Sequence, residues 1–344
     1  MKSKERIERA LRRQIPDQVP TFEWFIDPGV GERLTRSRDI LDIVETLDLD
    51  AVNVRPDYSR ERIGDTTFQD EWGCVREETG DVLPAVTRTP IEDITSHQDY
   101  QFPDPESTGR FRSLEKAVAR FGEERAVILN IRDGFSDMRD LLGYENALMA
   151  MVTEPELCKA LLERIVNYNV SLARLARKRC GVNIVATTDD IAYPGGLLIR
   201  PAIYHDLLAP AFRQVIQGFK SEGFLCIKHS DGNISMLIDL WIDAGIDCLD
   251  PIDPQGGLEL RAAKRSFGDK VCLKGNVDCA GVLCTGTEQE IEAAVLDCLD
   301  AAAAGGGYIL SSSNTIHRGV KPENYLAMLA ALRKHGVYSS PLPG

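Results

Sequence analysis

Short apolar runs that end in polar residues recur along the chain, and they predict the strands of a β-sheet. Helical patterns lie between most of them, so strands and helices are expected to alternate. The eight runs are VPTFEW (19–24), AVNVRP (51–56), AVILNIRD (126–133), IVATTDD (184–190), LCIKHSD (225–231), CLDPID (248–253), VCLKGNVD (271–278) and YILSSSN (308–314).

The clearest helical pattern runs from Thr153 to Cys180, because its apolar residues alternate in steps of four and three. Those residues are Leu157, Leu161, Ile165, Tyr168, Leu172 and Leu175. Thr153 and Glu156 form a capping-box pattern at the start of this helix, and Thr287 and Glu290 repeat that pattern before a later one. Further helices are predicted at 201–222, 233–244, 258–266 and 322–335.

This alternation favours an α/β fold of the (β/α)8 barrel type, with a doubly wound open sheet as the alternative. The alternation is regular only from about residue 126 onward. Residues 57–125 are therefore predicted to be an insertion after the second strand, built from a hairpin and loops. Residues 1–15 read as a charged amphipathic helix. Because neither a low-complexity linker nor an internal repeat interrupts the chain, we expect one domain over residues 1–344.

Composition narrows the class of protein. The formal net charge is −13, which argues against nucleic acid as the partner because binding to phosphates needs clustered Lys and Arg. The same acidity gives no reason to expect docking on an anionic membrane. The nine cysteines have no paired CxxC spacing, which indicates reduced thiols rather than disulfides. The N-terminal stretch lacks the apolar core of a secretory signal, and no later run approaches the length of a membrane span. We therefore expect a cytoplasmic protein that acts on a small molecule.

Polar residues gather at the carboxyl ends of the predicted strands, where (β/α)8 barrels carry their active sites. They are Glu23, Arg55, Asp57, Arg132, Asp133, Asp189, Asp190, His229, Asp231, Asp250, Asp253, Asn276, Asp278, Asn314 and His317. A structural role competes with this interpretation, because Asp and Asn at strand ends often cap the next helix. Asp189 and Asp190 are adjacent, so in a regular strand at most one is expected to face the mouth. The GGG at 305–307 enters a strand and predicts a tight turn, not a phosphate site.

His229 is the strongest single candidate among these residues. It ends an apolar strand, and Gly232 allows the backbone to turn just after it. It shares the predicted mouth with His317 and several carboxylates, which favours a functional role. With Asp231 it forms either a metal-ligand pair or a pair in which the carboxylate poises the imidazole for proton transfer.

Several motifs resemble those of the uroporphyrinogen decarboxylase superfamily, in order and spacing, over almost the whole chain. They are ERIERALRRQIPDQVP (5–20), DEWG (70–73), DLLGYENAL (140–148), TDDIAY (188–193), HSDGNI (229–234), AGIDCLDPI (244–252), LKGNVD (273–278), GGGYILSSSN (305–314), IH (316–317) and VKPEN (320–324). The resemblance independently implies a (β/α)8 barrel. It also implies one of two activities, decarboxylation of a porphyrinogen or cobamide-linked methyl transfer.

The chain departs from both well-known patterns. Where true decarboxylases carry an arginine-rich signature for the substrate's carboxylates, this chain reads FEWFIDPGVGER (22–33), and burying a polycarboxylated tetrapyrrole without clustered cations is costly. In thiol-using methyltransferases, a His-x-Cys step and a distant Cys hold a zinc ion. The zinc lowers the pKa of the thiol that attacks the methyl group. Here Asp231 follows His229, and the last strand ends in serines and Asn314. The resemblance therefore leaves zinc doubtful, although His229 and Asp231 offer nitrogen and oxygen ligands that His317 or Glu23 would complete.

The remaining resemblance is to the branch of corrinoid-linked methyltransferases. It implies a small methylated substrate such as a methoxy compound, a corrinoid (cobalamin) carried by a partner protein, and an acid that protonates the leaving atom. The residues expected to be catalytic are His229, Asp231, Asp189 and Asp190, and those expected to bind substrate are Glu23, Arg132, Asn276, Asp278, Asn314 and His317. The alternatives are a lyase that decarboxylates a porphyrinogen or another carboxylated substrate, and a non-catalytic binding protein. A homodimer is compatible with each of them.

Overall fold

A parallel β-sheet forms the centre of the protein. The computed structural model describes residues 1–79 and 84–338. Seven strands pair in the order β1 (Ala51–Val54), β6 (Ala126–Ile131), β7 (Ile184–Thr188), β10 (Leu225–His229), β11 (Cys248–Asp250), β12 (Cys272–Val277) and β13 (Tyr308–Ser312), and every neighbouring pair is parallel. Since these strands match seven of the eight predicted runs in chain order, the predicted α/β class is confirmed.

The first predicted strand, residues 19–24, is reduced to short bridges. The backbone N–H of Leu310 in β13 donates to the carbonyl of Pro20 over 3.0 Å, and Thr21 and Leu310 form a parallel bridge. On its other side the Thr21 carbonyl accepts the N–H of Asp50, the residue before β1, over 2.8 Å. This segment therefore contacts both ends of the sheet order, and the sheet curls around a central interior.

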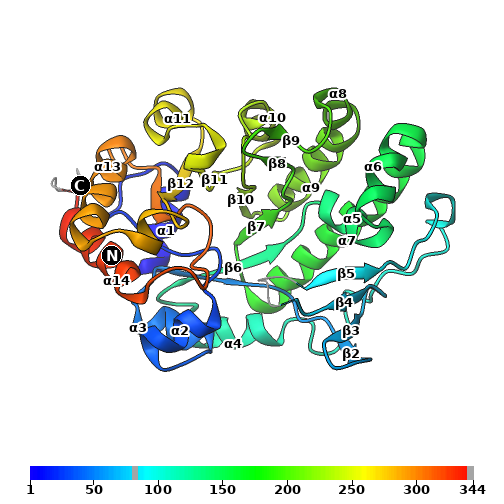
Figure 1. Ribbon diagram of the computed structural model, residues 1–344, viewed down its shortest axis with the longest axis horizontal. Helices are drawn as coiled ribbons and strands as arrows, with labels where there is room; N and C mark the ends of the chain where they lie inside the picture. The colour runs from blue at the N-terminus through cyan, green and yellow to red at the C-terminus, as the bar shows by residue number, and fades with distance from the viewer. Residues whose placement is uncertain (80–83, 339–344) are drawn as a thin grey trace.

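Helices cover the outer face of the curled sheet (Figure 1). The helices of the described residues are α1 (Ser3–Leu11), α2 (Pro28–Thr35), α3 (Ile40–Thr46), α4 (Arg112–Phe121), α5 (Phe135–Leu142), α6 (Tyr144–Thr153), α7 (Pro155–Cys180), α8 (Pro201–Ile203), α9 (Ala209–Ser221), α10 (Ile238–Ala244), α11 (Leu260–Phe267), α12 (Val282–Thr285), α13 (Glu288–Ala302) and α14 (Pro322–His335), of which α1 lies at the amino ends of the strands. Short helical turns lie at Ile94–Ser96, Tyr204–Leu208 and Pro254–Gly256. Within the described residues, no helix combines the length and the apolar character that crossing a membrane requires.

Capping explains where two of the helices begin. At α13 the predicted box is confirmed: the Thr287 side chain accepts from the backbone of Glu290, and the Glu290 carboxylate accepts from the backbone of Thr287. Such a cap is worth about 1 kcal/mol. The box predicted at Thr153 is wrong. Thr153 ends α6, where its hydroxyl donates to the Met149 carbonyl, and α7 starts at Pro155, whose fixed φ suits the first helical position.

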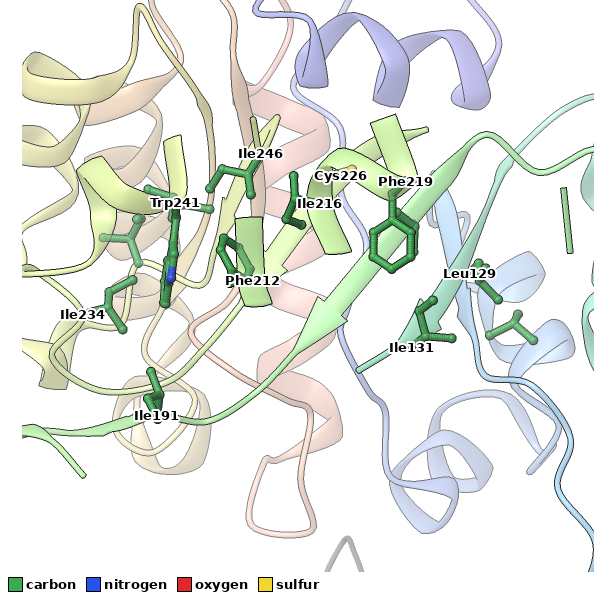
Figure 2. Packing of buried hydrophobic residues seen from close by; sticks show 14 of the residues in the cluster. Leu129, Ile131, Ile191, Phe212, Ile216, Phe219, Cys226, Ile234, Trp241 and Ile246 are labelled. Carbon is green, nitrogen blue, oxygen red and sulfur yellow. The ribbon is translucent and has the colours of Figure 1, made fainter. Parts of the chain in front are cut away.

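Apolar side chains form separate clusters on the two faces of the sheet. The outer cluster fills the space between strands and helices, and Figure 2 shows part of it, with Phe212, Ile216 and Trp241 near Cys226. The inner cluster takes alternate residues of each strand, together with residues from α1 and from the bridging segment 19–24. Its members are Ile7, Ala10, Leu11, Phe22, Trp24, Ala51, Ala126, Ile128, Ile184, Ala186, Leu225, Ile227, Cys248, Cys272 and Ile309. Because strand side chains alternate, this separation tells which residues face the interior.

Helix α1 contributes Ile7, Ala10 and Leu11 to the inner cluster, so it packs against the interior at the amino ends of the strands. The tight turn predicted for the GGG at 305–307 is confirmed, and this turn lies beside the end of α1. Its three glycines have φ between 67° and 80°, and a Cβ on Gly306 would lie 2.7 Å from the backbone of Gln14. All nine cysteines are free in the described structure, as predicted from their spacing.

The predicted insertion contains more regular structure than a hairpin and loops. Between β1 and α4 the chain forms a four-stranded antiparallel sheet of β2 (Arg60–Arg62), β3 (Thr67–Asp70), β4 (Val75–Glu77) and β5 (Ala85–Arg88). In Figure 1 this sheet projects from one side of the molecule, next to α5 and α6. Residues 80–83 of the predicted insertion lie outside the described residues. A second small hairpin joins β8 (Ala192–Tyr193) to β9 (Gly196–Leu197).

Candidate active site

The interior changes from apolar to polar toward the carboxyl ends of the strands. Ile227, Cys248 and Cys272 belong to the inner cluster, and two residues further along the same strands stand His229, Asp250 and Lys274. Side chains two apart in a strand share a face, so these three residues form a polar layer above the apolar interior. All three are buried.

Within this layer Asp250 connects the other two residues. His229 and Asp250 are direct partners in the register of β10 and β11, and His229 Nδ1 lies 3.0 Å from Asp250 Oδ2. Lys274 Nζ donates to the other carboxylate oxygen, Oδ1, over 2.7 Å. Burial raises the pKa of Asp250, but Lys274 and His229 outweigh it and hold that pKa below its usual value. Asp250 is therefore an ionised acceptor that fixes the orientation of the imidazole.

The orientation of His229 leaves one ring nitrogen available for chemistry. Since Asp250 accepts the proton of Nδ1, the other nitrogen, Nε2, faces Asp231, whose Oδ1 lies 3.7 Å away. The ring also stacks on Trp24, with 4.1 Å between the centroids and 14° between the planes. Burial lowers the pKa of His229, but Asp250 and Asp231 overcome this effect and raise it above the usual value.

Asp231 is bound on one side only. Its Oδ2 accepts a hydrogen bond of 2.6 Å from Asn314 Nδ2, whereas its buried Oδ1 has no hydrogen-bond partner among the described residues. Burial raises the pKa of Asp231 to about 6; the positive charge of His229 opposes this shift, and Asp190 and Asp253 add to it. A carboxyl group with this pKa exchanges a proton close to neutral pH.

Asp190 completes the group as an exposed carboxylate. One ligand atom from each of Asp190, His229 and Asp231 lies within 4.8 Å of the other two. An imidazole and two carboxylates fit a divalent cation that takes nitrogen and oxygen ligands. They do not fit the sulfur-based zinc site that the resemblance implies for thiol-using methyltransferases, because Asp231 stands in place of the first cysteine and the last strand ends in serines and Asn314 with no cysteine.

Asp189, predicted to be catalytic, turns away from this group. Its two carboxylate oxygens accept the backbone N–H groups of Phe135 and Ser136 over 2.5 and 2.9 Å, so it caps the start of α5. Only Asp190 of the adjacent pair lies beside His229, as the alternation argument predicts. Burial and the neighbouring carboxylate of Asp133 raise the pKa of Asp189, and Lys228 is paired with Asp133 over 2.7 Å.

Two residues predicted to bind substrate lie on the outer face of the sheet. Glu23 is buried, and its carboxylate accepts from the hydroxyl and the backbone N–H of Ser312 over 2.6 and 3.2 Å. Burial raises the pKa of Glu23 to about 7. The side-chain oxygen of Asn276 lies 3.4 Å from Cys298 Sγ in α13. These contacts join the strands to each other and to the helices, and they do not bring either residue to His229.

Two further residues predicted to bind substrate, Asp278 and His317, form hydrogen bonds with backbone groups of nearby loops. Asp278 Oδ1 accepts the backbone N–H groups of Ala280 and Gly281 over 2.9 and 3.0 Å, which is a capping contact. His317 Nε2 lies 3.0 Å from the Cys279 carbonyl, and its Nδ1 accepts the N–H of Gly319 over 3.1 Å. The prediction that His317 shares a site with His229 therefore finds no support in its contacts.

Arg132 lies in a cavity of about 620 Å³ between the carboxyl ends of β1 and β6 and the antiparallel sheet. Its guanidinium donates to Asp140 over 2.7 Å and to Asp137 over 3.3 Å. The pKa of Arg132 stays above its usual value because these carboxylates outweigh its burial. Of the predicted site residues, His229, Asp231, Asp190 and Asn314 form one group, and Arg132 belongs to this second region.

Comparison with known proteins decides the family. The family model described as uroporphyrinogen decarboxylase (URO-D) matches residues 69–335, which is more than half of the chain. The chain belongs to the uroporphyrinogen decarboxylase family. Its members differ in activity, as two curated relatives illustrate. The chain is 24% identical to the methylcobamide:CoM methyltransferase MtbA of Methanosarcina mazei, over 87% of this chain and 89% of that protein. It is 27% identical to a uroporphyrinogen decarboxylase of Legionella pneumophila, over 56% of this chain and 52% of that protein.

A solved structure supports the fold. A methyltransferase from Methanosarcina mazei superposes with a TM-score of 0.76 at 19% identity, over 97% of this chain and 99% of the other. The likeness to the methyltransferases thus covers nearly the whole chain, whereas the likeness to the decarboxylase covers about half. The family assignment made from motifs is therefore confirmed.

Three residues of the site were missed as functional candidates: Trp24, Asp250 and Lys274. Asp250 was noted at a strand end but given no role. A signal for two of them is present in the sequence, because Asp250 and Lys274 follow the inward-facing Cys248 and Cys272 by two positions. That signal can be used only when it is known that Cys248 and Cys272 face the interior. Trp24 has no such signal, because its contact with His229 joins segments 205 residues apart in the chain.

Proposed function

We propose that this chain is a methyltransferase on a (β/α)8 barrel that works with a corrinoid protein and takes a methyl group from a small donor. One observation carries the proposal: a buried, oriented imidazole whose free Nε2 faces the unpartnered oxygen of Asp231, at the carboxyl ends of the strands. The likeness to the methylcobamide:CoM methyltransferase, which extends over 87% of this chain, supports this reaction class.

The protein's part in this reaction is to supply a proton. A reduced corrinoid, when its carrier protein is docked, provides the nucleophile for the methyl carbon. As the bond from that carbon to oxygen or nitrogen breaks, its electron pair stays on the leaving atom, which then needs a proton. His229 Nε2 and Asp231 Oδ1, which lie 3.7 Å apart, are the two groups that can donate that proton, and the hydrogen bond of Nδ1 to Asp250 keeps the imidazole oriented. Asn314 fixes Asp231 so that Oδ1 stays directed at the imidazole.

The rival function, decarboxylation of a porphyrinogen, needs several free cations around the substrate. The group at His229 contains the carboxylates Asp190 and Asp231, and its one lysine, Lys274, is bound to Asp250. This arrangement suits a proton transfer to a leaving atom better than the binding of many carboxylates.

Two assays with the purified wild-type protein separate the functions. We expect methyl transfer from methoxy compounds to reduced cobalamin, or to a corrinoid protein, which is followed by the change in the absorption of cobalt. Release of CO2 from a porphyrinogen without cobalamin would replace the proposal by a lyase. Retention of a bound ligand with neither reaction would indicate a binding protein.

Metal analysis distinguishes the two roles of the His229–Asp231 pair. Because Asp231 Oδ2 is bound to Asn314 and the pair is arranged for proton exchange, we expect the purified protein to carry less than one equivalent of a divalent metal. Plasma emission spectrometry of the wild type, His229→Ala and Asp231→Asn gives the measurement. One equivalent of metal in the wild type that is lost in both variants would contradict the proton-transfer role.

A further inference from the structure

The cavity between the barrel and the insertion is open to a ligand of the size of a small aromatic acid. Its volume of about 620 Å³ lies in the range of ligand sites. Trp72, Tyr58 and Phe68 provide an aromatic part of its wall, and the ring centroids of Tyr58 and Trp72 are 5.8 Å apart. The wall thus combines an apolar surface with a set of charged side chains.

The charges of that wall are unlike those of the chain as a whole. Five arginines, Arg55, Arg60, Arg76, Arg132 and Arg139, line the cavity, against three aspartates, Asp70, Asp137 and Asp140. The protein itself has a net charge of −13. A local excess of positive charge in an acidic protein attracts an anion to this place.

Three of the five arginines already have partners. Arg76 binds Asp70 and Asp140 over 2.5 and 2.9 Å, and Arg132 and Arg139 share Asp140 over 2.7 and 3.3 Å. The guanidinium of Arg60 lies 5.2 Å from the ring centre of Phe68. Arg60 and Arg55 therefore have no ion pair with a described residue, and Arg60 is exposed at the edge strand β2 of the antiparallel sheet.

Arg55 has neither a hydrogen bond nor an ion pair with any described residue, although the cavity is charged around it. Its side chain is accessible to solvent, yet many protein atoms surround it, as expected for a side chain in a cavity. Desolvation by the surrounding protein atoms and the charges of Arg132 and Arg76 lower the pKa of Arg55 to about 10, whereas Asp190 acts in the opposite direction. An oxyanion beside Arg55 would relieve the repulsion and supply the missing partner.

Asp190 also connects the cavity with the His229 group. It supplies a ligand atom within 4.8 Å of those of His229 and Asp231, and its negative charge acts on Arg55. Arg55 therefore lies within electrostatic range of Asp190, which itself belongs to the group at His229.

We infer that Arg55 binds the carboxylate of a small anionic substrate whose apolar body lies against Trp72 and Tyr58, with its reacting end toward His229. The planar fork of the Arg55 guanidinium matches a planar carboxylate, and the negative charge of Asp190, which acts on Arg55, disfavours a dianion such as a phosphate ester. That this anion is the methyl donor rests on the function proposed above, whereas the anion site itself does not.

Calorimetric titration of the full chain, without any corrinoid, tests the site. The probes are 4-methoxybenzoate, the neutral 4-methoxybenzamide and 4-methoxyphenyl phosphate. We expect the wild type to bind the carboxylate at least about tenfold more tightly than the amide, which is about 1.4 kcal/mol. Arg55→Gln should remove that preference, and Arg55→Lys should retain part of it because the charge stays but the planar fork is lost. Arg12→Gln is the control and should bind as the wild type does, because Arg12 is exposed and follows α1 at the amino ends of the strands, away from the cavity.

Three results would overturn the inference: equal or undetectable binding of carboxylate and amide by the wild type, a carboxylate preference that persists in Arg55→Gln, or tighter binding of the phosphate. Thermal unfolding of each variant shows whether it is folded, and Arg55→Lys decides the matter if Arg55→Gln is not. Methyl transfer is measured separately. Failure of that assay with intact carboxylate binding contradicts the proposed function and leaves the anion site standing.

Discussion

His229→Asn is expected to reduce the rate of methyl transfer by about 10² to 10⁴, the usual contribution of a positioned acid. Asparagine is chosen because its amide can still donate to Asp250 from the place of Nδ1, so the buried carboxylate keeps a partner beside Lys274. Nothing in the variant replaces Nε2, the atom that faces Asp231. The measurement is the single-turnover rate with reduced cobalamin and saturating donor.

The control for this variant is His205→Gln, since His205 is exposed and lies outside the site. It should leave the rate unchanged. A His229→Asn protein that is folded and reacts within about threefold of the wild type would rule out His229 as the acid. Such a result would move the proton donor to Asp231 alone or to the solvent.

The same pair predicts how the rate depends on pH. Donation requires the protonated form, and burial raises the pKa of Asp231 to about 6 while the pKa of His229 is also raised. The two groups titrate as a pair among Asp190, Asp250 and Lys274. With His229 as the acid, we expect the rate to fall as pH rises through the raised pKa of His229, which lies above the pKa of about 6 of Asp231. In Asp231→Asn the ionisation of that carboxyl is gone, so the pH at which the rate falls should change; an unaltered profile would assign the fall to another group.

Arg6→Met is expected to cost about 3 to 5 kcal/mol of the free energy of unfolding, as removal of one partner from a buried ion pair does. Arg6 Nη1 donates to Asp50 Oδ1 over 2.6 Å, and the Asp50 side chain is only 4% exposed. Asp50 also accepts the backbone N–H of Thr21, in the segment that joins β13 to the start of β1. Methionine fills a similar volume but leaves that carboxylate without its cation. Urea unfolding followed by circular dichroism gives the value.

Arg9→Met in the same helix is the matched control. Arg9 pairs with Glu5 on the surface over 3.0 Å, and such an exposed pair contributes at most about 0.5 kcal/mol. Equal destabilisation by the two variants would show that loss of helix charge matters and that the pair of Arg6 with Asp50 does not hold the closing segment in place.

The sequence by itself determined the order of the elements and the place of the site along the chain. Apolar runs of strand length and helical periodicity are local properties, so seven strands and the main helices could be predicted from neighbouring residues. The box at Thr287 and the GGG turn are local in the same way, and both were predicted. The box at Thr153 failed because a second helix ends there, and a local pattern does not say on which side of a residue the helix lies.

Only the tertiary structure decided which polar residues meet. Glu23, Asp189, Asn276, Asp278 and His317 all stand at strand ends in the sequence, yet each one bonds to a neighbouring strand, helix or loop. Asp250 and Lys274 reach His229 because strands far apart in the chain pair in one register and alternate their side chains around a common interior. Arg55 stands at a strand end in the sequence, but only the cavity shows that Arg76, Arg132 and Arg139 around it are paired and that Arg55 is not. The burial and the bonding partners of these polar residues depend on contacts between distant segments, and no short stretch of sequence specifies those contacts.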